Sequence, residues 1–194
     1  MDAGTCRMSL VHLPNWWDAP KSLLETDGHC GLLAAWMVLR HFKKRFSADN
    51  LAGACRYTKR HGVFTVGLAA ALKLHGLQVS FHTDPDLQIG GFERRCYARA
   101  ARMGLHPLPA LELTDVLKTQ HAGAVPIVLF NSESDVGHFS PLIGLHKGML
   151  KLPLADGEKM GMAQFLTRWS EPGILRQCVI ATVSPVRRRQ WRYE

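Results

Sequence analysis

The chain contains 194 residues, of which 46% are hydrophobic and 21% are charged. These values are close to those of ordinary globular domains and exclude a disordered, collagen-like or low-complexity chain. The length favours one domain, since most domains contain roughly 100–200 residues. We therefore expect a single domain over residues 1–194, with an irregular N-terminal segment at 1–27 and a basic tail at 185–194.

The net charge of +8 at pH 7 limits the class of partner only loosely. Basic residues form short runs such as HFKKRF and VRRRQWRY, and no recognisable nucleic-acid-binding module accompanies them. We interpret these runs as solvated faces and a basic tail, and a nucleic-acid partner is the rival interpretation. The five cysteines contain no CxxC pair, and no P-loop or GxGxxG motif occurs. We therefore expect neither a metal nor a cofactor.

The sequence contains no apolar run near the ~20 residues that a membrane-spanning helix requires. Its N-terminus also lacks the basic stretch and apolar core of a secretory signal. We expect a protein without a membrane span that is cytoplasmic, or exported without a recognisable signal peptide. The sequence does not indicate an oligomeric state.

The first half of the chain predicts mainly helices. The segment CGLLAAWMVLRHF, at 30–42, is apolar around its whole circumference and predicts a central buried helix, with Asp27 in the N-cap position. Further helices are predicted at 48–60 and 64–76, the second ending at Gly76. A strand at 77–83 follows.

The second half predicts mainly strands. Helices are predicted at 91–104, at 113–123 with Thr114 as its cap, and at 163–169. Strands are predicted at 125–131, 138–146, 149–155 and 177–183, with a turn at Lys147–Gly148 between the second and third. This segregation predicts an α+β fold, in which a helical lobe packs on an antiparallel sheet.

Cys30 occupies the first position of the predicted central helix and is followed by Gly31. The helix dipole and the free amide hydrogens at a helix N-terminus stabilise a thiolate. The backbone N–H of Cys30 is also placed to donate to an oxyanion, and Gly31 leaves the approach to the sulfur unobstructed. The alternative interpretation is a buried small apolar residue, because free cysteines usually lie in the core.

His138 begins an alternating strand, in Gly137-His138-Phe139-Ser140-Pro141, after the polar loop SESDVG. At a strand end the ring is exposed enough to titrate and is held by the sheet. An imidazole has a reference pKa of ~6.5, so it can accept a proton and return it. An ordinary strand-end histidine is the alternative interpretation.

Together, His29-Cys30-Gly31-Leu32 and Gly137-His138-Phe139-Ser140-Pro141 resemble the papain-like cysteine peptidase clan. Within the clan they look most like the bacteriocin-leader (double-glycine) peptidases and the phytochelatin synthases, over residues 27–169. The resemblance implies a papain-like fold, in which a helical lobe with the nucleophile faces a sheet lobe with the base across a cleft. It also implies a bacterial protein with a peptide or protein substrate.

Asp156, in LPLADGEK, is the predicted third member of a catalytic triad. It follows the strand expected to pair with the strand of His138, so its carboxylate could fix the imidazole tautomer. Asp-Gly is also a common turn pair. Asn131, Asp135 and Glu158 are the competing candidates.

The oxyanion hole departs from the family pattern. Relatives usually carry a glutamine six residues before the nucleophile, where this chain has Leu24, a side chain that cannot donate a hydrogen bond. Thr26 is the neutral donor nearby. We therefore expect the oxyanion hole to consist of the Cys30 N–H and Thr26.

These residues predict a thiol-dependent amide hydrolase, a cysteine peptidase that works through Cys30, His138 and Asp156 and an acyl-enzyme. Glutamine deamidation and γ-glutamyl transpeptidation are alternative reactions on the same fold. Loss of one oxyanion donor typically costs ~10²–10³ in rate. A degenerate papain-like binding module without activity is therefore the remaining rival.

Overall fold

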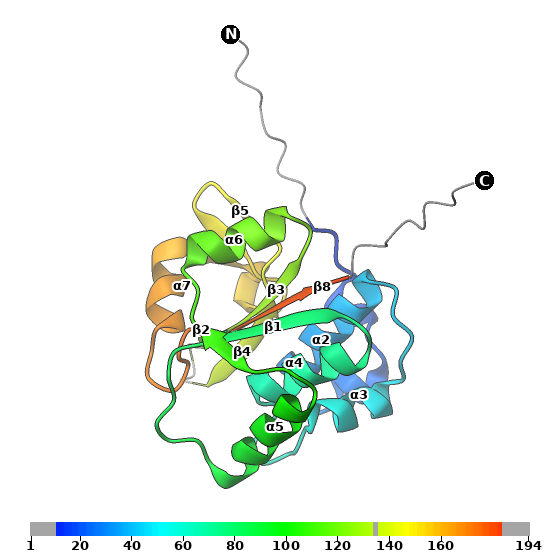
Figure 1. The fold of residues 1–194 in the computed structure, drawn as a ribbon. Helices are drawn as coiled ribbons and strands as arrows, with labels where there is room; N and C mark the ends of the chain where they lie inside the picture. Colours follow the sequence, from blue (N-terminus) through cyan, green and yellow to red (C-terminus); the bar gives the residue numbers. More distant parts are fainter. Residues whose placement is uncertain (1–10, 134–135, 184–194) are drawn as a thin grey trace, which may run out of the picture.

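The most apolar stretch of the sequence forms the central helix of the fold. In the computed structural model, which describes residues 11–133 and 136–183, helix α2 (Cys30–His41) buries every residue from Gly31 to Leu39. Helix α4 (Thr65–Leu74) is buried over most of its length and packs beside α2 (Figure 1). The basic tail predicted at 185–194 lies outside the described residues.

Shorter or more polar helices surround these two. They are η1 (Trp16–Asp18), α1 (Lys21–Leu24), α3 (Ala48–Cys55), α5 (Gly91–Arg102), α6 (Leu113–His121), η2 (Asp156–Glu158) and α7 (Met162–Trp169).

The strands form two sheets. The larger sheet has the order β2-β1-β8-β3-β4 and contains β1 (Gln78–Thr83), β2 (Pro107–Pro109), β3 (Val125–Asn131), β4 (Gly137–Pro141) and β8 (Cys178–Thr182). All neighbours in this sheet are antiparallel except β1 and β2. The smaller sheet is the antiparallel set β5 (Gly144–His146), β6 (Met149–Lys151) and β7 (Lys159–Gly161). The predicted α+β class is confirmed.

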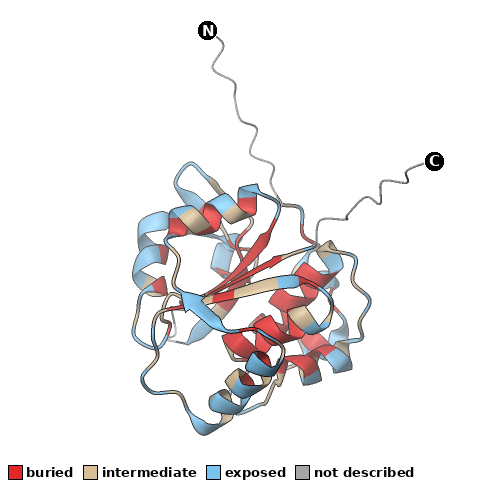
Figure 2. Cartoon of the chain, viewed as in Figure 1, coloured by how far each residue is buried: buried red, intermediate tan, exposed pale blue. Residues whose placement is uncertain are grey.

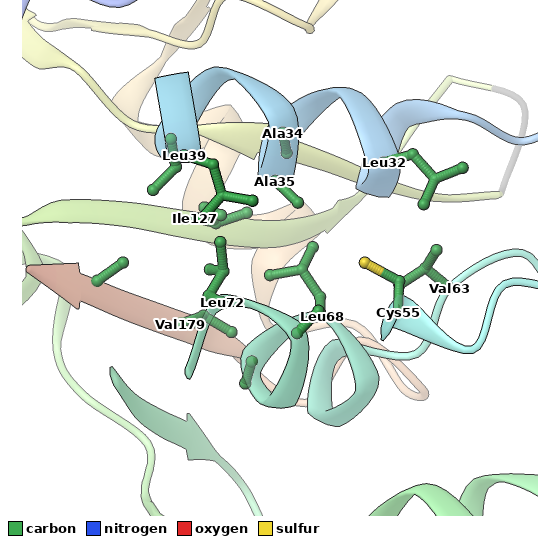
Figure 3. Close-up of a cluster of buried hydrophobic side chains, with 14 of the residues drawn as sticks. Leu32, Ala34, Ala35, Leu39, Cys55, Val63, Leu68, Leu72, Ile127 and Val179 are labelled. Carbon is green, nitrogen blue, oxygen red and sulfur yellow. The ribbon is translucent and has the colours of Figure 1, made fainter. Parts of the chain in front are cut away.

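The larger sheet has a hydrophobic core on each face (Figure 2). On one face, Leu72 of α4 and side chains of α2 pack with Ile127 and Val179 of the sheet (Figure 3). On the other face, Val128 packs with Phe165 of α7. Because successive side chains of a strand point to opposite faces, the neighbours Ile127 and Val128 enter different cores.

Two predicted helix caps are wrong. The N-cap of α2 is His29, since Gly28, with φ 62°, separates Asp27 from the helix. The N-cap of α6 is Glu112, and Thr114 lies inside that helix.

Two segments also differ from the prediction. Helix α3 ends at Cys55 and not near residue 60, because Arg56 adopts the left-handed conformation with φ 54°. The segment expected to be irregular contains η1 and α1 within its described part. Pro20 is the N-cap residue of α1, and the buried Leu23 anchors this turn in the core.

The segment 138–146, predicted as one strand, forms two strands in two sheets. The N–H of Leu142 still donates to β3, at Pro126, whereas the N–H of Ile143 donates to β6, at Lys151. The chain therefore leaves the larger sheet between these two residues. The pairing expected across the Lys147–Gly148 turn therefore forms between β5 and β6. It does not extend to β4, the strand of His138, which pairs with β3 instead.

Strands β2 and β7 were not predicted. Each has three residues, which is too short for an alternating pattern to be recognised. Two of the three residues of β2 are prolines, which fits its place at the sheet edge. Among the described residues, no helix is both long enough and apolar enough to cross a membrane.

Candidate active site

Cys30 lies where α2 begins, and α2 contacts β4. Hydrogen bonds hold the loop that leads to it. Tyr57 Oη donates to the Asp27 carbonyl at 2.8 Å, and His29 Nδ1 donates to the Thr26 carbonyl at 2.7 Å. The half-buried thiol therefore stands at the end of a fixed loop.

Gly31 lets the start of α2 approach β4 closely. A Cβ at this position would lie 3.0 Å from Val63 Cβ and 3.1 Å from Phe139 Cδ2, both closer than ordinary contacts. Gly31 is itself buried. The missing side chain therefore serves the packing of α2 against the strand of His138, and not the substrate access expected from the sequence.

The structure brings the side chains of Cys30 and His138 together: both line the same two cavities, and each shifts the pKa of the other. His138 is the second residue of β4, and its Nε2 lies 2.5 Å from the Leu154 carbonyl oxygen. Because a carbonyl oxygen only accepts hydrogen bonds, Nε2 carries a proton. In the neutral ring the lone pair is then on Nδ1, the nitrogen left for the thiol.

Ser140 fixes the carbonyl that orients this ring. It lies two residues beyond His138 on β4, on the same face of the strand, and it is fully buried. Its Oγ accepts a hydrogen bond from the Leu154 N–H at 3.1 Å. Leu154 is thus held through both its N–H and its carbonyl. Sequence reasoning missed this arrangement, because no residue pattern marks a backbone carbonyl as a partner.

Electrostatics shift the pKa values of Cys30 and His138 towards each other. Burial alone raises the pKa of the Cys30 thiol, but the hydrogen bond and charge of His138 and the N–H groups of Phe139 and Gly31 outweigh it, and the pKa falls below its ordinary value. Burial likewise lowers the pKa of His138, but the contact with Cys30 and the Leu154 carbonyl raise it above its ordinary value. Both shifts favour transfer of the proton from sulfur to nitrogen.

Asp156 lies near this pair but does not accept the Nε2 hydrogen bond. It is exposed, in η2, and lines a cavity together with Cys30 and His138. Its negative charge contributes to the raised pKa of His138. The Nε2 hydrogen bond goes to Leu154 instead.

The three competing residues differ in position. Asn131 donates a side-chain hydrogen bond to the Glu171 carboxylate. Glu158 is exposed and lines the same cavity as Asp156. Asp135 lies outside the described residues.

Of the two expected oxyanion donors, the Cys30 N–H has no acceptor within its helix, and the Thr26 hydroxyl already donates to a backbone carbonyl. The N–H of Cys30 lies in the first turn of α2, where backbone N–H groups have no acceptor within the helix. The hydroxyl of Thr26 donates to the Ser22 carbonyl at 2.7 Å. Leu24, at the family's glutamine position, packs against the hydrophobic core.

Two cavities adjoin Cys30. One of about 600 Å³ is lined by residues that include Arg60 and Gly137, and another of about 300 Å³ by residues that include Trp16 and Asp156. Both include His29, Cys30 and His138. Within the described residues, no group of three or more His, Cys, Asp or Glu side chains is arranged to hold a metal ion.

Comparison with known proteins bears on the fold. No protein-family model matches the sequence, and no curated protein matches it. Solved structures do match. A double-glycine-motif protease from an AMS/PCAT transporter, in complex with the leader peptide, is 16% identical with a TM-score of 0.54, over 90% of this chain and 94% of that chain.

Two further solved structures also match the fold of this chain. The peptidase domain of Streptococcus ComA, a bifunctional ABC transporter of a quorum-sensing pathway, is 12% identical with a TM-score of 0.51, over 90% of this chain and 99% of that one. A protein described as a C39-like peptidase from Bacillus anthracis is 14% identical with a TM-score of 0.54, over 81% and 90%. Double-glycine (C39) peptidase domains are papain-like cysteine peptidases. This chain has their fold. The predicted papain-like architecture is confirmed.

Proposed function

We propose that this papain-like domain is a cysteine peptidase that cleaves a peptide bond with Cys30 as nucleophile and His138 as general base and acid. The contact between these two side chains is the observation that carries the proposal. It places a thiol at a helix N-terminus beside an imidazole whose other nitrogen is already held, the arrangement that nucleophilic catalysis by cysteine requires.

In the acylation step, the thiol proton moves to His138 Nδ1 and the sulfur attacks the carbonyl carbon. A C–S bond forms, and the carbonyl electron pair moves onto oxygen, where the Cys30 N–H donates to it. When the tetrahedral intermediate collapses, the C–N bond breaks and Nδ1 returns the proton to the leaving amine. The product is a thioester on Cys30.

In the deacylation step, His138 takes a proton from water, and the hydroxide attacks the thioester carbonyl. The C–S bond breaks, the acid product leaves, and the proton returns to sulfur. The Leu154 carbonyl keeps the ring oriented through both steps. We assign Asp156 a supporting role, because its charge stabilises the imidazolium. Thr26 is the proposed second oxyanion donor, which requires its hydroxyl to leave the Ser22 carbonyl.

A peptide is the substrate that this site suits. The two cavities that meet at Cys30 give room for chain on both sides of a scissile bond. One structure with the same fold was solved in complex with a leader peptide. We therefore propose an extended segment of a peptide or protein as the substrate.

The first test measures thiol reactivity with iodoacetamide at neutral pH and maps the product by mass spectrometry. Cys30 should react fast. Burial raises the pKa of Cys55 to about 12 and also raises those of Cys96 and Cys178, so these thiols are internal controls that should stay unmodified. Equal reactivity of Cys30 and the controls would remove the basis of the proposal.

The second test measures cleavage of a fluorogenic peptide library. Cys30→Ala and His138→Ala should abolish cleavage, whereas His146→Ala, which changes an exposed histidine of β5, should not. Mass spectrometry of the products separates the rivals: peptide fragments indicate hydrolysis, ammonia release indicates deamidation, and joining to an added amine indicates transpeptidation. Binding without turnover, retained in Cys30→Ala, would indicate a degenerate module.

A further inference from the structure

A further cavity adjoins the 600 Å³ cavity at the Cys30 thiol. It has a volume of about 420 Å³ and does not touch Cys30 itself. The residues that it shares with the 600 Å³ cavity at the thiol are His61, Val63, Val136, Gly137 and Phe139. The two cavities are therefore neighbours along one groove, and a peptide held at Cys30 can place another of its side chains in the further cavity.

Two carboxylates line this cavity. Asp86 comes from the loop between β1 and α5, and Glu93 comes from the first turn of α5. Both residues are half-buried. Burial and the nearby charge of Asp86 raise the pKa of Glu93. The two like charges are thus close enough to disfavour each other inside a partly desolvated space.

In the described part of the chain, the Gln88 N–H donates a hydrogen bond to Asp86 Oδ1 at 2.7 Å, but no cation is paired with either carboxylate. The guanidinium groups of Arg56 and Arg95 lie over the Phe92 ring, at 5.3 and 5.2 Å from its centre. A half-buried carboxylate is stabilised when a cation reaches it, so the cavity has an unmet preference for positive charge.

Thr65 provides an independent sign of a missing partner. It lines the same cavity, is only 3% exposed, and its Oγ1 has no hydrogen-bond partner among the described residues. Buried hydroxyl groups nearly always have a partner. A ligand that donates hydrogen bonds into this cavity would supply one.

We propose that this cavity, the acidic subsite formed by Thr65, Asp86 and Glu93, binds the positively charged side chain of a lysine or arginine in the peptide substrate. The ammonium or guanidinium group pairs with the two carboxylates and donates a hydrogen bond to Thr65 Oγ1. The inference rests on the proposed peptidase function. It adds that a basic residue close to the scissile bond determines which peptides are cleaved.

An organic cation fits this subsite better than a metal ion. The described residues contain no arrangement of three or more His, Cys, Asp or Glu side chains that could hold a metal, although the cavity has two acidic residues. The volume of about 420 Å³ lies in the range of pockets that take organic groups. The lining also includes the apolar side chains of Phe64 and Ile174, which can pack against the methylene groups of a basic side chain.

The main experiment measures kcat/KM on fluorogenic peptides in which one position at a time is fixed as Arg, Lys, Gln or Glu. At one position, the wild-type protein should prefer Arg and Lys over Gln by about tenfold or more, as expected of charge-assisted hydrogen bonds. Glu93→Gln and Asp86→Asn should each reduce this ratio, and Thr65→Val should reduce it less. Asp49→Asn, an exposed change of the same charge on α3, should leave the ratio unchanged.

A second measurement does not require turnover. In Cys30→Ala, amide NMR signals of Thr65, Asp86 and Glu93 should shift on titration with N-acetyl-arginine N-methylamide, and much less with the glutamine analogue. The shifts should disappear in the double variant Cys30→Ala, Glu93→Gln. Equal shifts with both compounds, or shifts confined to other parts of the chain, overturn the acidic subsite.

The two proposals fail in different ways. Cleavage with no preference for a basic residue at any position refutes the acidic subsite and leaves the peptidase intact. No cleavage of any peptide, with ordinary reactivity of Cys30, refutes the peptidase, and the NMR titration then decides alone whether the subsite binds a cation.

Discussion

Replacing Gly31 by alanine tests whether close packing of α2 against β4 sets the geometry of the site. The added Cβ would meet Val63 Cβ at 3.0 Å and Phe139 Cδ2 at 3.1 Å. Carbon atoms in ordinary contact are ~3.5–4.0 Å apart, so the neighbours must move away by a few tenths of an ångström. Phe139 directly follows His138 on β4, so a shift of this strand also moves the imidazole relative to Cys30.

Two effects of the Gly31→Ala substitution oppose each other. Overpacking of a core typically costs ~1–3 kcal/mol, whereas replacing glycine by alanine in a helix gains ~0.5–1 kcal/mol. We expect overpacking to win, with a net loss of about 1–2 kcal/mol in the free energy of unfolding, because both neighbours are themselves held by core packing. For a domain of this size, this loss lowers Tm by about 2–8 °C. A displacement of ~1 Å costs about 10²-fold in rate, so this smaller shift should lower kcat/KM by up to about tenfold.

The assay combines urea unfolding, peptide cleavage and the rate of Cys30 alkylation. Gly53→Ala is the matched control, because it makes the same change in helix α3, where a Cβ meets no atom within 4 Å. It should stabilise the protein by ~0.5–1 kcal/mol and leave the alkylation rate unchanged. If Gly31→Ala behaves like Gly53→Ala in stability and in alkylation, the packing argument is refuted.

Three further predictions concern Cys30, His138 and the groups around them. The rate of Cys30 alkylation by iodoacetamide should rise with pH through a midpoint below that of an ordinary thiol, because the pKa of Cys30 is lowered. In His138→Ala the two largest effects that lower this pKa are lost, while burial still raises it, so the midpoint should move to higher pH. Asp156→Asn should reduce kcat/KM by about tenfold or less, because the Leu154 carbonyl and not Asp156 accepts the hydrogen bond from Nε2–H. Replacing a hydrogen-bonded triad carboxylate costs ~10⁴-fold, so a loss of that size would restore the full triad. Ser140→Ala should leave the Leu154 N–H unpaired and lower the free energy of unfolding, measured in urea, by ~1–3 kcal/mol. It should also lower kcat more than it changes KM, and an unchanged kcat would show that the Leu154 carbonyl needs no support from Ser140.

Local sequence patterns determined much of the framework. The apolar run after Cys30 is long enough to form only a buried helix, and α2 follows it closely. The apolar segment at 125–131 matches β3 in both bounds, because a central strand buried on both faces has few other conformations available. A cysteine at a helix start and a histidine at a strand start are local features too, so both candidate residues could be found without the fold.

Tertiary structure decided how the site is completed. A backbone carbonyl orients His138, and its position depends on where the chain leaves β4, joins the smaller sheet and returns at Leu154. That path follows from hydrogen-bond pairing between strands, together with the Ser140 contact that holds Leu154. The acidic subsite likewise joins residues of α4, α5 and the loop before α5 to the groove beside β4. Packing brings these segments together, so residue spacing along the chain could not reveal either arrangement.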